Sequence, residues 1–332
     1  KAADTAKKVT TVEGDAWLVG TSSKKYEMGN SNATDTAITG ESVRDITTFV
    51  GDDELDALKD GTWSTNEQSY DYQQFLFFDA DAVEGTLVSA NRIVKYAEND
   101  EDKTGDHFFI KNGRQIARYR LEFTSTAQSD VTDSAGSADT TGTYLDDFEN
   151  TDISFFGKPY TVVLARRPAS AAIGAQNSIR MVLMAGSAHD TVLESETKSY
   201  SVGDKSYEVT LSYVDDDEAK FIVNGEATNK LKVGETYVLK DKSEIGVSEI
   251  LYQSYAGGVH SATFFVGAQK LELRDDDVTA SSAGGNQIKI GSESIDGTNT
   301  IITGSDNNVT FSVSTIEVNM TAEDDYFVGT ND

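Results

Sequence analysis

The chain has 332 residues, 38% of them hydrophobic, and a formal charge of −28 from 56 acidic and 28 basic side chains. This charge argues against binding to nucleic acid or to an anionic membrane, because both require clustered Lys and Arg to replace counterions. Cysteine is absent, which excludes disulfides, thiolate metal sites and a cysteine nucleophile. The charge favours cations and cationic surfaces as partners.

The N-terminal 40 residues are mostly polar and surround one apolar island, "AWLVG" at 16–20. They predict an extended segment, 1–40, that contains one strand. The next motif, "GDDELDALKDG", has two leucines at helical spacing, acidic residues in its first turn and a final Gly, so it predicts a short helix near 52–60. A further helical turn is expected at 144–150.

From residue 69 onward most apolar residues alternate with polar ones, which is the period of half-buried strands. The alternating runs are 69–78, 86–97, 107–111, 115–124, 158–167, 178–186, 197–202, 205–214, 219–225, 236–241, 244–255, 260–275, 287–291, 298–304 and 309–320. Gly, Asp and Asn turns separate them. The pattern predicts an all-β fold of tandem antiparallel β-sandwiches, Ig-like or related, with one or two short helices.

One hairpin series is especially regular, "EVTLSYVDDDEAKFIVNGE" at 208–226. Its second strand ends at Asn224-Gly225, a pair that tolerates the positive φ of a tight hairpin turn. The acidic residues Asp215–Glu218 therefore lie at the opposite tip of the same meander.

Domain borders are marked only by composition, because the chain has two prolines and no Pro-rich linker. Polar or small-residue stretches lie at 129–143, 166–177 and 274–286. They predict four parts, which are the extended segment 1–40, a β-domain at 41–190, a β-domain at 191–277, and the start of a further β-domain or β-extension at 278–332.

The sequence begins at Lys1 without a Met or an apolar signal segment, and it has no run of 18 apolar residues. A strand pattern is still running at 325–328. We therefore expect the chain to be a piece of a longer polypeptide, without direct membrane insertion by this chain.

The run "ETKSYSVGDKSYEVTLSYVDDDEAKFIVNGEATNKLKVGETYVLKDKSEIGVSEILYQ", 196–253, resembles archaeal surface-layer (S-layer) proteins, in which a similar order of strand, acidic turn, "VNGE", "GETY" and "IGVSEIL" recurs. "LKDGTWSTNEQSYDYQQFLFF" and "FGKPYTVVLARR" are similar to the preceding parts of that pattern, so the resemblance covers 52–277, about two thirds of the chain. It implies a secreted, often glycosylated structural protein whose copies tile the cell surface as a two-dimensional lattice. It implies no catalytic residues.

Acidic residues gather in clusters at Asp52–Asp53, Asp100–Asp106, Asp146–Asp147, Asp215–Glu218, Asp275–Asp277 and Glu323–Asp325. Calcium takes about six to eight oxygen ligands, best supplied by close carboxylates and loop carbonyls. We predict that most clusters are solvated turns and that one binds calcium or another divalent cation. The candidate ligands are Asp215, Asp216, Asp217 and Glu218 or, failing these, Asp275, Asp276 and Asp277.

The cluster at 100–106 partly matches an EF-hand loop. Asp100, Asp102, Thr104 and Gly105 have the required spacing. Lys111, however, stands where a bidentate Glu closes such a loop, so the match is weak.

Enzymatic motifs are weak as well. With 56 acidic residues, adjacent carboxylates arise from composition alone, so a glycosidase pair is not indicated. The histidines His107, His189 and His260 follow no metal-ligand spacing. Ser187 and Ser261 lie near histidines without a nucleophile-elbow motif. We expect no enzyme activity and no organic cofactor.

Three N-glycosylation sequons occur, at Asn32, Asn308 and Asn319. They become glycan sites if the protein is exported. Together with the charge, the resemblance implies an extracellular S-layer subunit whose partners are identical copies in a lattice and divalent cations, with no nucleic acid. The alternative is an exported adhesin or carbohydrate-binding β-sandwich protein, followed by a virion or tail protein and, last, a secreted glycoside hydrolase.

Overall fold

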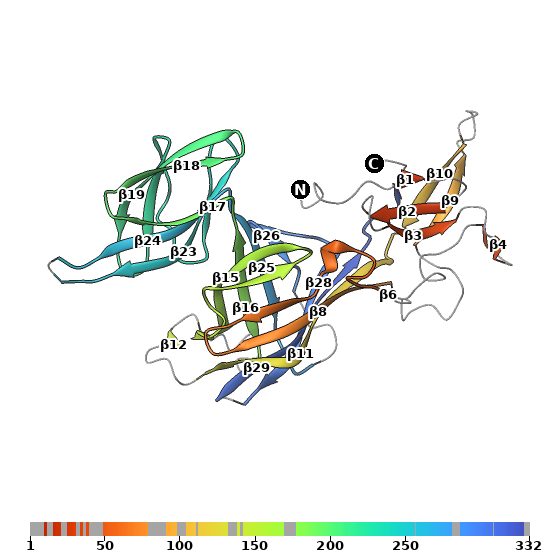
Figure 1. Ribbon diagram of the computed structural model, residues 1–332, viewed down its shortest axis with the longest axis horizontal. Helices are drawn as coiled ribbons and strands as arrows, with labels where there is room; N and C mark the ends of the chain where they lie inside the picture. Colours follow the sequence, from red (N-terminus) through yellow and green to blue (C-terminus); the bar gives the residue numbers. More distant parts are fainter. Residues whose placement is uncertain are drawn as a thin grey trace.

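The computed structural model describes residues 49–78, 112–131, 142–168, 177–255, 257–280, 286–307 and 309–328, together with the separate strands at 10–11, 16–20, 25–30, 34–35, 38–39, 91–97, 104–110 and 138–139. Their regular structure consists almost entirely of antiparallel strands, which confirms the predicted all-β class. Figure 1 shows a sandwich in the centre of the molecule, with a second sandwich on one side and the sheet of β9 and β10 on the other.

The central sandwich has two sheets that enclose one core. The first sheet has the order β28 (Thr298–Asp306), β29 (Thr310–Thr321), β11 (Gln115–Asp130), β8 (Ser69–Phe77) and β6 (Phe49–Val50), with β7 (Gly61–Ser64) paired to β8. The second has the order β12 (Ala138–Asp139), β13 (Gly142–Tyr144), β15 (Lys158–Pro168), β16 (Ile179–Ala185), β25 (Gln269–Asp275), β26 (Lys289–Ile290) and β27 (Glu293–Ser294), with β14 (Thr151–Phe155) paired to β15.

Alternation produces this core directly. In β8 the side chains of Tyr70, Tyr72 and Gln74 point inward and their neighbours outward. Across the core, Trp63 of the first sheet donates to Thr151 Oγ1 of the second at 2.8 Å. Burying the indole therefore costs no unpaired N–H.

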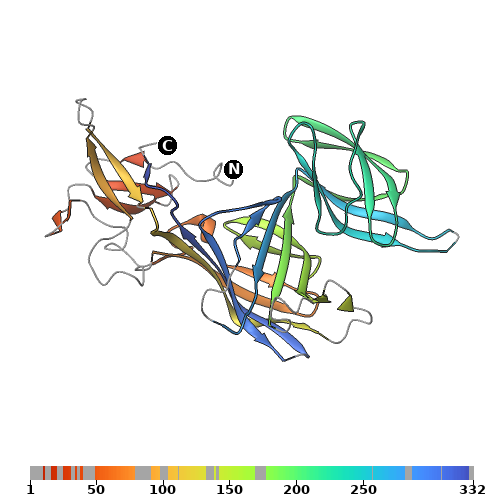
Figure 2. The same cartoon turned by 180° about the vertical axis from the view of Figure 1, so that it is seen from behind.

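The second sandwich is an insertion between β16 and β25. These two strands are antiparallel neighbours throughout, from Ile179 opposite Asp275 to Ala185 opposite Gln269. The chain that connects them forms one sheet of β17 (Ala188–Leu193), β24 (His260–Val266), β23 (Glu244–Tyr252) and β22 (Thr236–Val238), and another of β18 (Thr197–Val202), β19 (Lys205–Val214), β20 (Ala219–Val223) and β21 (Glu226–Ala227). We call it the inserted sandwich; Figure 2 shows it from the opposite side.

The remaining strands belong to smaller sheets. These are β30 (Tyr326–Val328), β10 (Thr104–Ile110) and β9 (Asn91–Ala97); β1 (Thr10–Thr11), β2 (Ala16–Gly20) and β3 (Lys25–Asn30); and β4 (Thr34–Asp35) with β5 (Ile38–Thr39). The strand predicted at 16–20 is confirmed as β2. The segment 1–40 holds further paired strands, where the sequence predicted one.

Two local predictions need correction. The helix expected near 52–60 is only a 3-10 turn, η2 (Asp56–Leu58). The carbonyl of Gly51 accepts from the N–H groups of Glu54 and Leu55, but Leu55 has an extended backbone (φ −130°, ψ 117°) that interrupts the helical turn. The helical turn expected at 144–150 is a sequence of hydrogen-bonded turns without a helix.

The sheet pairing also differs from the predicted borders. The segment 278–332, expected to start a further domain or extension, contributes β28 and β29 to the central sandwich, where β29 pairs with β11. Likewise, β25 lies inside the predicted 191–277 domain but pairs with β16. The polar stretches mark loops, but they do not mark domain borders, because the strand after a loop can pair in the same sheet as the strand before it.

Candidate functional site

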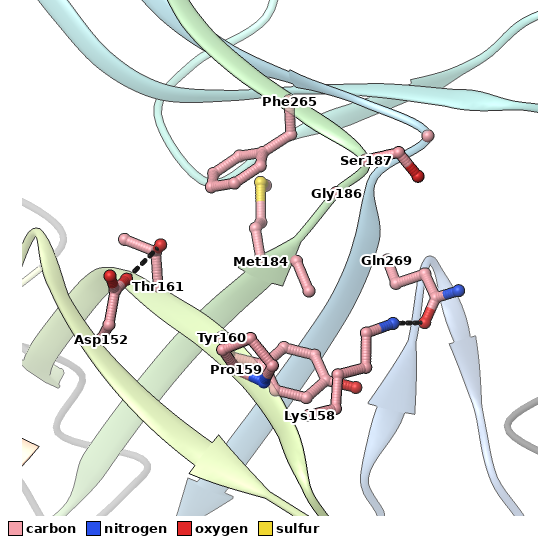
Figure 3. A pocket seen from close by; sticks show the side chains of 12 residues that line it. Asp152, Lys158, Pro159, Tyr160, Thr161, Met184, Gly186, Ser187, Phe265 and Gln269 are labelled. Atoms are coloured by element: carbon pink, nitrogen blue, oxygen red, sulfur yellow. Dashed lines mark hydrogen bonds between the residues drawn. The ribbon is translucent and has the colours of Figure 1, made fainter. Parts of the chain in front are cut away.

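One hollow in the described part of the chain lies where the two sandwiches meet. It has a volume of about 310 Å³, and its walls come from β14, β15, the end of β16, β24 and the start of β25. We call it the recess and define it by six side chains that line it, Asp152, Lys158, Tyr160, Met184, Phe265 and Gln269 (Figure 3).

Beside the recess, apolar side chains fill the contact between the sandwiches. The members are Val163, Leu164, Val182, Met184, Phe265 and Ala268, each at most 6% exposed. We call them the junction cluster. Gly246 of the inserted sandwich is needed there, since a Cβ at this position would lie 2.7 Å from Met184 Sδ. The Met184 side chain of the central sandwich therefore packs directly against the backbone of the inserted sandwich.

The polar groups of the recess stand on different sides of it. Asp152 Oδ1 accepts from the Thr161 hydroxyl at 2.6 Å, whereas Lys158 Nζ donates to Gln269 Oε1 (Figure 3). Burial lowers the pKa of Lys158 and raises that of Tyr160, because water no longer solvates their charged forms fully. The recess thus offers both an ammonium and a carboxylate to a small ligand.

His189 lies near the recess, with its ring stacked on Phe265 at 4.0 Å. Burial lowers the pKa of His189, against the opposing effects of Asp152, Asp190 and Glu249. Its Nε2 lies 3.4 Å from Ser248 Oγ.

The Ser248–His189 contact does not resemble a hydrolytic triad. Ser248 is only 3% exposed, and no carboxylate among the described residues hydrogen-bonds to His189. A triad needs a base held by a carboxylate and a nucleophile that substrate can reach. The role of His189 that these contacts support is packing over the ring of Phe265.

The acidic hairpin tip predicted to bind a cation is held by its own contacts. Asp215 Oδ1 accepts from the N–H groups of Asp217 at 3.0 Å and Glu218 at 2.7 Å, and its Oδ2 accepts from the Tyr213 hydroxyl at 2.6 Å. Lys230 Nζ lies 3.2 Å from both Asp215 and Glu218. The Tyr213 hydroxyl, these N–H groups and Lys230 hold the pKa of Asp215 well below its usual range.

The second predicted cation site has a structural role. Asp275 is 2% exposed and accepts from the N–H of Ile302 in the opposite sheet and from that of Asp277, both at 2.8 Å. Asp276 pairs with Arg274 at 3.2 Å, and Asp277 caps the following turn. Burial raises the pKa of Asp275, and its two backbone donors oppose this effect.

No group of three or more His, Cys, Asp or Glu side chains in the described ranges is arranged to hold a metal ion. Cation binding at Asp215–Glu218 or at Asp275–Asp277 remains a prediction. In the EF-hand-like segment, Thr104 and Gly105 belong to β10, paired with β9, and 100–103 lie outside the described residues.

The sequons stay predictions too. Asn32 and Asn308 lie outside the described residues. Asn319 is half-buried in β29, between β11 and β28, and its side-chain oxygen accepts from Gln115 at 2.9 Å.

His260 forms a contact that sequence reasoning missed. Its Nδ1 lies 2.9 Å from Glu194 Oε2 and its Nε2 lies 3.1 Å from the carbonyl of Gln253. Both partners are acceptors, so these contacts favour the protonated imidazole, in which both ring nitrogens donate. These acceptors raise the pKa of His260 and join the end of β17 to the β23–β24 hairpin.

The recess itself was also missed, because its residues come from strands far apart in the sequence. Of its six defining side chains, Lys158 and Tyr160 lie in the motif "FGKPYTVVLARR", but that motif indicates a family resemblance and not a binding site. No protein-family model fits the sequence, and neither a curated protein nor a solved structure matches it. Within the described residues, no helix has the length and hydropathy to cross a membrane.

Proposed function

We propose that this protein is a structural subunit of a self-assembling archaeal surface layer. The observation that carries the proposal is the junction between the sandwiches. The chain enters the inserted sandwich from β16 and returns into β25, the antiparallel neighbour of β16, and the junction cluster is buried between the two sandwiches. Domains in one chain usually move relative to each other unless their contact is large and hydrophobic. A tiling subunit needs this restraint, because its contact surfaces must keep fixed angles.

The inserted sandwich also offers a surface for contact with identical copies. Its β23–β24 hairpin projects from the body (Figure 1) and exposes Leu251, Tyr252, Tyr255 and Val259, by 45%, 37%, 65% and 43%. Grouped apolar side chains in water favour association. The hairpin is therefore the contact we assign to the lattice.

Charge and sequence pattern support the same role. Copies with a charge of −28 repel one another, and divalent cations between them would reduce the repulsion. The ordered motifs at 196–253 resemble those of S-layer proteins. We accordingly propose an extracellular lattice, stabilised by cations such as calcium and glycosylated at one or more sequons.

Electron microscopy of the purified chain, with calcium and after chelation, tests this function. We expect ordered sheets in calcium and their loss after chelation, before the domains unfold. The double variant Tyr255→Ser with Val259→Ser should assemble poorly. The control Ile290→Ser, which alters a side chain 44% exposed outside the hairpin, should assemble like the parent. A parent that stays monomeric at every calcium and protein concentration would exclude the function.

A further inference from the structure

The recess joins a buried apolar floor to polar groups that can form further hydrogen bonds. Met184 is fully buried and Phe265 is 4% exposed, so the floor does not depend on loop conformation. A volume of about 310 Å³ lies at the lower end of the range of roughly 300 to 1,000 Å³ for small-molecule sites. A single sugar-sized ligand suits this space.

Lys158 indicates the charge of the ligand. Its polar contacts in the described structure are Gln269 Oε1 and the ring of Tyr160, whose centroid lies 5.4 Å from Nζ. No carboxylate of the described residues pairs with it, although the chain has 56 acidic side chains. A partly desolvated ammonium is unfavourable without an opposite charge. An anionic group beside Nζ would supply that charge.

The other groups indicate hydroxyls. Asp152 uses Oδ1 for Thr161, which leaves Oδ2 able to accept from a ligand. A carboxylate accepts only, so its ligand partner must carry O–H or N–H groups. The Ser187 hydroxyl and the Gln269 amide can pair with further hydroxyls. Asp152 also repels a ligand carboxylate, which directs that group toward Lys158.

We propose that the recess binds a hydroxylated carboxylate of monosaccharide size, a uronic acid, with its carboxylate at Lys158 and its hydroxyls at Asp152, Ser187 and Gln269. The rim of Tyr160 contacts the apolar edge of the sugar ring. This binding is independent of lattice formation, because every named group belongs to one copy.

Isothermal titration of the monomeric chain in chelator tests the proposal with four probes, namely glucuronate, its neutral amide glucuronamide, acetate and glutamate. We expect saturable binding of glucuronate. Glucuronamide should bind at least about tenfold more weakly, since it lacks the charge-assisted hydrogen bond to Lys158. Acetate and glutamate should bind still more weakly, because they lack the ring hydroxyls.

Two variants that each remove one positive charge distinguish binding in the recess from a general effect of the protein's charge. Lys158→Met should reduce glucuronate affinity about 10- to 100-fold and remove the preference over glucuronamide. Lys240→Met changes an exposed lysine outside the recess and should bind like the parent. Absence of saturable glucuronate binding, equal binding of acetate, tighter binding of glutamate, or equal loss in both variants would each overturn the proposal. The lattice can form or fail without affecting this result.

Discussion

Replacing Met184 by Ala tests whether the junction cluster fixes the two sandwiches. Met184 is fully buried, contacts the inserted sandwich through Phe265, and lies against the backbone at Gly246. Truncating a buried Met to Ala costs about 2 to 5 kcal/mol, partly from the lost transfer energy and partly from the cavity. Because the cavity opens between the sandwiches, the loss weakens their contact more than either core.

Leu183→Ala is the matched control. Leu183 is the preceding residue of β16, also fully buried, but its side chain points into the core of the central sandwich. Both variants should unfold at lower denaturant concentration. Only Met184→Ala should broaden the distribution of interatomic distances that small-angle scattering gives for the native state. Only this variant should also be cleaved faster by proteases in the connection near Gly186. If the two variants are alike in scattering and in proteolysis, the junction does not restrain the sandwiches.

Three further predictions concern charged side chains. The pKa of His260, measured by NMR, should lie above its usual value of about 6.5 and fall toward it in Glu194→Gln. Because protonation stabilises the folded hairpin, that stabilisation is complete below about pH 6.5 and is lost as pH rises through the raised pKa; a normal pKa would contradict the contact. Asp275→Asn should lower the unfolding free energy by about 1 to 3 kcal/mol, since one buried backbone N–H loses its acceptor, and an unchanged denaturation midpoint would contradict this. Lys230→Met should raise the depressed pKa of Asp215 and make the hairpin tip responsive to calcium by NMR; the same calcium response in the parent would show that Lys230 does not take the place of the ion.

The sequence predicted local structure well wherever alternation was clear. The run at 205–214 is β19, with Tyr207, Val209 and Leu211 buried as the pattern requires. The turn at Asn224-Gly225 is confirmed, with φ of 49° and 79°. These features depend on neighbours in the chain, so a single sequence contains them.

Features that depend on distant pairing could not be predicted. Alternation tells which side chains share a face of a strand, but it does not tell which strand lies beside it. Lys158 of β15 and Gln269 of β25 lie 111 residues apart in the sequence and meet only because both strands pair with β16. At the acidic hairpin tip the sequence showed the carboxylates but not that Lys230 forms ion pairs with two of them.

The insertion explains why the recess and the junction occur together. A module inserted between adjacent antiparallel strands leaves and returns at the same end of the strand pair, so both connections are short, and here they run through Gly186–Ser187 and Gly267–Ala268. Short connections hold the module against the outer face of β15 and β16, where apolar residues are buried and polar ones remain at the rim. We expect the apolar part to restrain the angle between the sandwiches and thereby to hold the walls of the recess at a fixed distance. A variant that loosens the junction must therefore also weaken uronic acid binding, even when it changes none of the polar groups that contact the ligand.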